Sequence, residues 1–109
     1  MTIITEDYVS DETFKLLKEK GFDDSCCRFV IESDETYYRG APTLQMAMKW
    51  LREVHNIDIF PWKIGKGIYS CAIFNSNTGQ DLSSNKDFPS EKYEETVESA
   101  IKYCLENLI

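Results

Sequence analysis

The sequence predicts an α+β fold, in which a small antiparallel sheet of three to five strands has two or three helices packed on one face. Residues 43–55 and 90–108 carry apolar side chains spaced by three and four, which is typical of amphipathic helices. Between them, residues 57–64 and 68–74 are rich in β-branched and aromatic side chains and flank a glycine-containing turn, which indicates a hairpin. No linker divides the 109 residues, so we expect a single domain over residues 1–109.

A first helix is expected at about residues 11–20. Ser10 is a suitable N-cap, and Asp11 and Glu12 place negative charge on the first turn, where the helix dipole favours it. Gly21 follows the last turn and is suited to the left-handed conformation that ends many helices.

Two short strands are expected next. Residues 26–32 (CCRFVIE) have the composition of a strand, and residues 33–35 form a turn. Residues 36–39 (TYYR) are then placed to pair back as a short strand before Pro42.

Thr43 is the expected N-cap of the second helix, and Asn56 is suited to its C-terminal end. Its main apolar stripe consists of Leu44, Ala47, Met48, Leu51, Val54 and His55. Met46 and Trp50 form a second, flanking stripe. Apolar cover this wide predicts burial on more than one side, or one side that contacts a partner.

The strand at 57–64 contains Pro61, which cannot donate a ladder hydrogen bond, so it is either an edge strand or it ends there. Residues 65–67 (GKG) form the turn to the strand at 68–74. Residues 75–85 are polar and loop-like, with room for a short strand near 86–88. The last helix is expected to begin at Ser90, with acidic residues in its N-terminal half.

The net charge of −7 is spread along the chain and lowers the expectation of a nucleic-acid partner. The N-terminal residues do not form a secretory signal, and no apolar run approaches the ~18 residues of a membrane span. We therefore expect a cytoplasmic protein with reduced thiols and no membrane association.

A resemblance adds to this interpretation. The stretches DETFKLLKEKGFD, APTLQMAMKWLREVHNIDI and YEETVESAIKYCLENLI together resemble a group of small uncharacterised proteins of gut anaerobes, their phages and mobile elements. Residues 45–53 (QMAMKWLRE) carry most of the specificity. The resemblance implies a bacterial or phage cytoplasmic setting and transfers no activity and no catalytic residue.

The residues suited to thiol or metal chemistry do not form a recognisable motif. Zinc sites usually pair cysteines two to four residues apart, whereas Cys26 and Cys27 are adjacent, and Cys71 and Cys104 lie within apolar patterns. We expect no metal, no cofactor and no catalytic residue. A thiol nucleophile at Cys26 or Cys27 with His55 as base remains the third functional alternative.

A nucleic-acid role is the second alternative. It would use a basic patch or, through its acidic surface, mimicry of DNA. The patch would contain Arg28, Arg39, Lys49, Arg52, Lys63 and Lys66, together with the aromatic residues Tyr37, Tyr38 and Trp62. The turn at 65–67 does not match a phosphate-binding loop.

The favoured hypothesis is a non-enzymatic interaction or accessory module that binds another protein, or a second copy of itself as a homodimer. Large apolar and aromatic side chains outside the main helix stripe are typical of interface anchors. The candidate contact residues are Met46, Trp50, Trp62, Tyr37 and Tyr38.

Overall fold

The computed structural model describes residues 8–23, 28–31, 36–39, 42–83 and 87–109. These residues form three helices, α1 (Asp11–Glu19), α2 (Leu44–His55) and α3 (Tyr93–Asn107). They also form four strands, β1 (Arg28–Ile31), β2 (Thr36–Arg39), β3 (Ile57–Gly65) and β4 (Ile68–Asn75). The α+β class is confirmed. One sheet of three to five strands is not confirmed, because the described strands pair as two separate antiparallel hairpins, β1–β2 and β3–β4.

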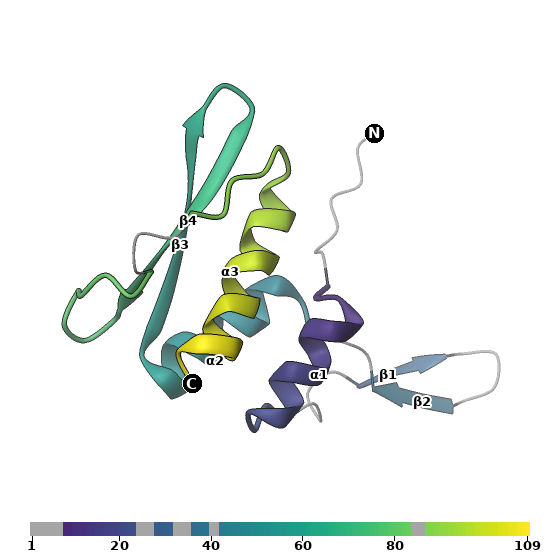
Figure 1. Cartoon of the computed structure of the whole chain (residues 1–109). Helices are drawn as coiled ribbons and strands as arrows, with labels where there is room; N and C mark the ends of the chain where they lie inside the picture. Colours follow the sequence, from purple (N-terminus) through teal and green to yellow (C-terminus); the bar gives the residue numbers. More distant parts are fainter. Residues whose placement is uncertain (1–7, 24–27, 32–35, 40–41, 84–86) are drawn as a thin grey trace.

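The elements are arranged in layers (Figure 1). Helices α2 and α3 lie side by side on one face of the β3–β4 hairpin, and α1 packs against α3. Strands β1 and β2 pair with Arg28 opposite Arg39 and Ile31 opposite Thr36. The expectation that helices cover one face of a sheet therefore holds for α2 and α3 on β3–β4.

The helix ends follow the local chemistry of the sequence. Ser10 caps α1 by accepting a hydrogen bond from the Thr13 N–H, and Thr43 caps α2 by accepting one from the Met46 N–H. Asn56 ends α2 in the left-handed conformation at φ 57°, and Gly21 follows α1 at φ 97°. These four predictions are confirmed.

The two faces of the β3–β4 hairpin have different environments. Alternate side chains of β3, starting with Ile57 and Ile59, are buried against the helices together with Cys71 and Ile73 of β4. The largest side chains with no exposed surface come from all the packed helices and from β4, and they are Leu17, Leu51, Ile73, Ile101 and Leu105. The core thus lies between the helices and one face of this hairpin.

The two edges of the hairpin also differ. Tyr69 of β4 exchanges two backbone hydrogen bonds with Ser90, at 2.8 and 2.9 Å, and the Leu82 N–H donates to the Ile73 carbonyl at 2.7 Å. These backbone groups therefore point away from β3, toward the chain that follows β4. Lys63 and Ile59, the β3 residues opposite Tyr69 and Ile73, therefore point their backbone groups toward the outer edge of β3. The same is true of Pro61, which lies two residues from each of them.

Pro61 thus lies on an unpaired edge among the described residues, where its missing N–H removes no ladder bond. The prediction of an edge strand is confirmed, and β3 continues past the proline to Gly65.

Helix α3 begins at Tyr93, so the predicted start at Ser90 is wrong. Pairing with Tyr69 holds the Ser90 backbone in a bridge to β4, which prevents it from entering the helix. The Ser90 hydroxyl still accepts from the Lys92 N–H and donates to Glu95. Of the short strand expected near 86–88, residue 86 lies outside the described residues, and residues 87–88 are not in a strand.

Two side-chain hydroxyls hold the backbone of Phe88. Its N–H donates to Ser70 Oγ at 3.1 Å, and its carbonyl accepts a hydrogen bond from Thr96 Oγ1. Ser70 belongs to β4 and Thr96 to α3, and both are buried. The Phe88 ring is buried as well, so this contact joins β4, the segment before α3 and α3 itself in the core.

Within the part of the chain that the structure describes, no helix has the length and apolar character of a membrane span.

Replacing Ser70 with Ala tests this contact. The Phe88 N–H would lose its partner in a buried position, so we expect the free energy of unfolding to fall by about 1–3 kcal/mol. The matched control is Ser99→Ala, on the exposed face of α3, which should change stability by less than about 0.5 kcal/mol. Urea unfolding followed by circular dichroism measures both. Equal effects of the two substitutions would contradict the role of Ser70.

Candidate functional site

Two exposed aromatic side chains lie on the face of the β3–β4 hairpin that is turned away from α2 and α3. We call it the outer face and define it by Asp58, Phe60, Trp62, Ala72 and Phe74, which together line an open hollow of ≈540 Å³. Phe60 is 60% exposed and Trp62 is 48% exposed. Exposed aromatic side chains next to a hollow are a common feature of contact surfaces.

Strand register creates this surface. Residues directly opposite each other in an antiparallel pair lie on the same face, and here Asp58 is opposite Phe74 and Phe60 is opposite Ala72. The small Ala72 side chain leaves space between the larger rings. Inward-facing Ile59 and Ile73 are buried in the core and hold the two strands on the helices. The packing on one face thus fixes the position of the aromatic side chains on the other.

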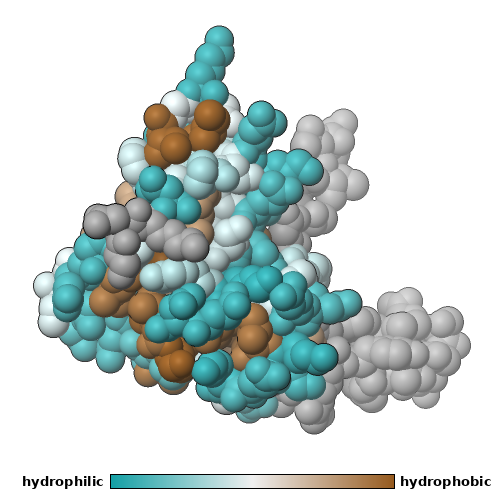
Figure 2. Space-filling model, viewed as in Figure 1, coloured by the Kyte–Doolittle hydropathy of each residue, from teal (hydrophilic) through white to brown (hydrophobic). Residues whose placement is uncertain are grey.

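Apolar side chains also gather near the turn of the hairpin. Ile64 is 43% exposed and Ile68 is 40% exposed, on either side of the turn that contains Lys66. Figure 2 shows hydrophobic surface near the turn, at the top of the view. The Lys63 ammonium lies 5.9 Å from the centre of the Tyr69 ring, which places it on the inward side of the strand pair.

Charges of opposite sign lie at the two ends of the β3–β4 hairpin. Phe74 is flanked by Asp58 on β3 and by Asp81, with which it forms an isolated bridge. Hydrogen bonds from the Ser83 hydroxyl and backbone N–H lower the pKa of Asp81, so this carboxylate is ionised at neutral pH. Lys66 lies at the opposite end, in the turn.

Of the five predicted contact residues, the structure describes the side chains of Met46, Trp50 and Trp62, and it does not bring these three together. Trp62 is on the outer face, whereas Met46 and Trp50 are on α2, which packs on the other side of the hairpin. Met46 is 36% exposed. Tyr37 and Tyr38 are in β2, and their side chains lie outside the described residues.

Trp50 is a partly buried residue at the margin of the core. Its ring meets the Phe22 ring edge-on, with centroids 5.6 Å apart, and the His55 ring at 4.7 Å. These contacts favour a packing role for Trp50. Phe60 and Phe74, which the sequence prediction omitted, share the outer face with Trp62. The signal that could have found Phe60 is its position two residues before Trp62 on the strand.

The described thiols are buried and poorly suited to nucleophilic chemistry. Burial raises the pKa of the Cys71 thiol, and burial raises the pKa of the Cys104 thiol to about 12. The His55 Nε2 atom is buried and has no hydrogen-bond partner among the described residues, so it is not paired with either thiol. The predicted nucleophiles Cys26 and Cys27 lie outside the described residues.

Metal ligands do not cluster in the described part of the chain, where no group of three His, Cys, Asp or Glu side chains is placed to hold an ion. The basic residues of the nucleic-acid alternative are dispersed. Lys49 and Arg52 belong to α2, and Lys66 lies in the β3–β4 turn. Arg28 and Arg39 are opposite each other on β1 and β2, with side chains outside the described residues.

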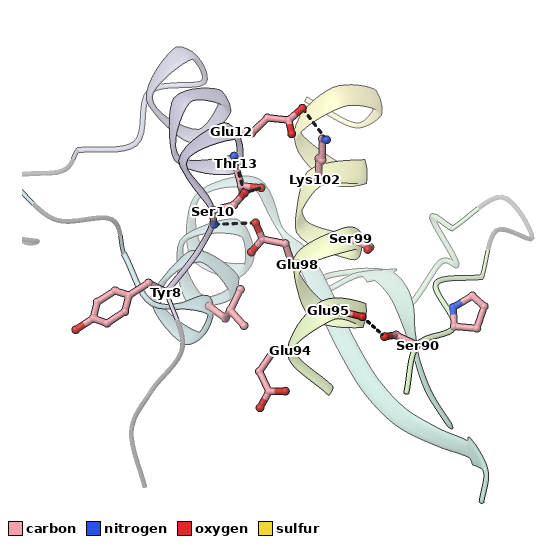
Figure 3. A pocket seen from close by; sticks show the side chains of 12 residues that line it. Tyr8, Ser10, Glu12, Thr13, Ser90, Glu94, Glu95, Glu98, Ser99 and Lys102 are labelled. Carbon is pink, nitrogen blue, oxygen red and sulfur yellow. Dashed lines mark hydrogen bonds and ion pairs between the residues drawn. The ribbon is translucent and has the colours of Figure 1, made fainter. Parts of the chain in front are cut away.

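A larger, acidic cleft of ≈1220 Å³ lies between α1 and α3 (Figure 3). Three of its carboxylates make structural contacts. Glu98 accepts a hydrogen bond from the Ser10 N–H at 2.9 Å, Glu12 pairs with Lys102 at 2.7 Å, and Glu95 accepts one from Ser90. The hydrogen bond with Glu12 raises the pKa of Lys102. These contacts attach α1 to α3 and support the start of α3.

Comparisons with known proteins add no family to this description. Searches against protein families, curated proteins and solved structures gave no match.

The two tryptophans offer a matched comparison. Trp50→Ala would remove a ring packed against Phe22 and the core, so we expect a loss of about 2–3 kcal/mol in the free energy of unfolding. Trp62→Ala removes an exposed ring and should cost less than about 1 kcal/mol. Chemical denaturation of both variants measures the difference. A larger loss for Trp62 than for Trp50 would contradict the assignment of Trp50 to the core and Trp62 to the surface.

Thiol labelling tests the burial of Cys71 and Cys104. In a Cys26→Ser/Cys27→Ser variant, both remaining thiols should react slowly with a disulfide reagent at pH 8, because they are shielded and protonated. Their reactivity should increase as the pH rises, since thiolate forms only above the ordinary thiol range. Full reaction is expected after unfolding in guanidinium chloride. A fast-reacting thiol in the folded variant would contradict the burial of Cys71 and Cys104.

Proposed function

We propose that this protein is a small non-enzymatic interaction module that binds another protein through the outer face. The observation that carries the proposal is the pair of exposed aromatic side chains, Phe60 and Trp62, on a sheet face that the described helices leave uncovered. Burial of aromatic area is a large source of binding free energy, at about 25 cal/mol per Å² of apolar surface. The setting we propose, a bacterial or phage-infected cytoplasm, follows from the sequence resemblance.

The strand register supports this proposal over a purely structural role for the aromatic residues. An exposed strand position facing water alone is commonly polar. Here two successive outward positions of β3, Phe60 and Trp62, are aromatic, and the small Ala72 lies opposite Phe60 on β4. The side chains converge on one hollow, which gives a partner both an apolar contact and a shape to fit.

Affinity capture with a paired set of variants tests the proposal. The outer-face variant is Phe60→Ser/Trp62→Ser. The control is Met46→Ser/Val54→Ser, which removes two exposed apolar side chains from α2. Proteins from the lysate of a bacterial host are captured on wild-type and variant proteins and quantified by mass spectrometry. We expect a partner that wild type and the α2 variant retain at similar levels and that the outer-face variant loses.

Two results would count against this function. Loss of the partner from the α2 variant alone would indicate that the partner binds at Met46 and its neighbours and not at the outer face. Salt-sensitive binding of a single-stranded oligonucleotide, abolished by Trp62→Ser, would replace the protein partner with nucleic acid, because stacking on an aromatic sheet face serves that role too.

A further inference from the structure

We infer that the outer face receives a second copy of this chain, so that two β3–β4 hairpins stack face to face with their strands running in opposite directions. This inference rests on the proposed function, because it assigns a partner to the same surface. Three features of the described residues support it: the blocked edge of β3, the shape of the outer face and the arrangement of charge along it.

The edge of β3 is a poor route for association. The backbone groups of Ile59, Pro61 and Lys63 point toward this edge, as the pairing of β4 requires. Pro61 has no N–H, so an added strand would lack a donor near the middle of β3. The opposite edge of the hairpin is occupied by the backbone of Leu82 and Ser90. Contact through the exposed face is therefore favoured over extension of the sheet.

The shape of the outer face suits a copy of itself. Phe60 and Trp62 project from β3, and the hollow lies beside them over Ala72. A two-fold axis places every feature of one copy against the same surface of the other, so a contact of this kind needs both a projection and a hollow. The outer face contains both, and a Trp62 ring from each copy would be placed to fill the hollow of the other.

The two ends of the β3–β4 hairpin carry opposite charges, as a two-fold contact with antiparallel hairpins requires. Asp58 and Asp81 lie at one end, and Lys66 lies in the turn at the other. Asp58 and Lys66 are eight residues apart. At about 3.3 Å per residue of extended strand, the distance between them is at most about 26 Å. When two hairpins stack with opposite directions, the acidic end of each copy meets the lysine of the other.

The remaining surface works against other self-contacts. The chain has a net charge of −7, and the cleft between α1 and α3 is lined by Glu12, Glu94, Glu95 and Glu98. Two such surfaces repel each other. The outer face is only two strands wide. A contact confined to it would bury less than the ~800 Å² per partner of an ordinary stable interface. We therefore expect a dimer that dissociates on dilution.

A charge exchange tests the inference. Asp58→Lys and Lys66→Glu each place like charges opposite one another in the stacked pair, so each variant alone should dimerise about tenfold more weakly than wild type. An equimolar mixture of the two should recover association, because the lysine at 58 in one chain then meets the glutamate at 66 in the other. Lys49→Glu, on α2, is the control and should dimerise like wild type. Sedimentation equilibrium over a wide concentration range measures wild type, the three single variants and the mixture.

A mixture that associates no better than its separate components would overturn the stacked arrangement. Wild-type protein that stays monomeric at every concentration would overturn the second copy as partner. If the outer-face variant in that case still loses a captured host protein, the proposed function stands and only the identity of the partner changes. Circular dichroism checks the fold of each variant. Asp58→Asn and Lys66→Gln, which remove charge without reversing it, replace any variant that does not fold.

Discussion

The structure depends on the way in which two hydroxyl groups hold the backbone of Phe88. Ser70 accepts from its N–H and Thr96 donates to its carbonyl, in a region from which water is excluded. Satisfying both groups allows an irregular stretch of chain to lie in the core, where an unpaired amide would be costly. This attachment draws the chain along β4 and places α3 on the hairpin, and it leaves the outer edge of β3 and the outer face uncovered among the described residues.

The difference between the two faces of the hairpin follows from this arrangement. On the inner face, Ile59 and Ile73 are buried by the helices, so their apolar area stabilises the fold. On the outer face, Phe60 and Trp62 are also apolar, but much of their surface is exposed to water. Their apolar area contributes little to folding and remains available to binding. One short hairpin thereby serves both the core and the candidate contact surface.

The features that the sequence predicted correctly depend on neighbouring residues. Ser10 and Thr43 cap helices through hydrogen bonds to residues three positions away, and Asn56 takes a conformation set by its own backbone. Serine is a common helix N-cap, so the sequence favours a helix start at Ser90. The backbone pairing of Ser90 with Tyr69, which is distant in sequence, keeps Ser90 out of α3. The difference between Trp50 and Trp62 likewise depends on which elements pack together. Periodicity could group Phe60 with Trp62, but it could not identify the face that the helices would leave open.

Pro61 also disfavours the addition of further strands along the outer edge of β3. A free strand edge with all its donors accepts a further strand on each new molecule, and such addition has no natural end point, as in fibrils. A contact through the outer face with two-fold symmetry is complete after two molecules, because each copy covers the surface of the other. An imino acid in the middle of β3 therefore favours a closed pair over open-ended growth along this edge.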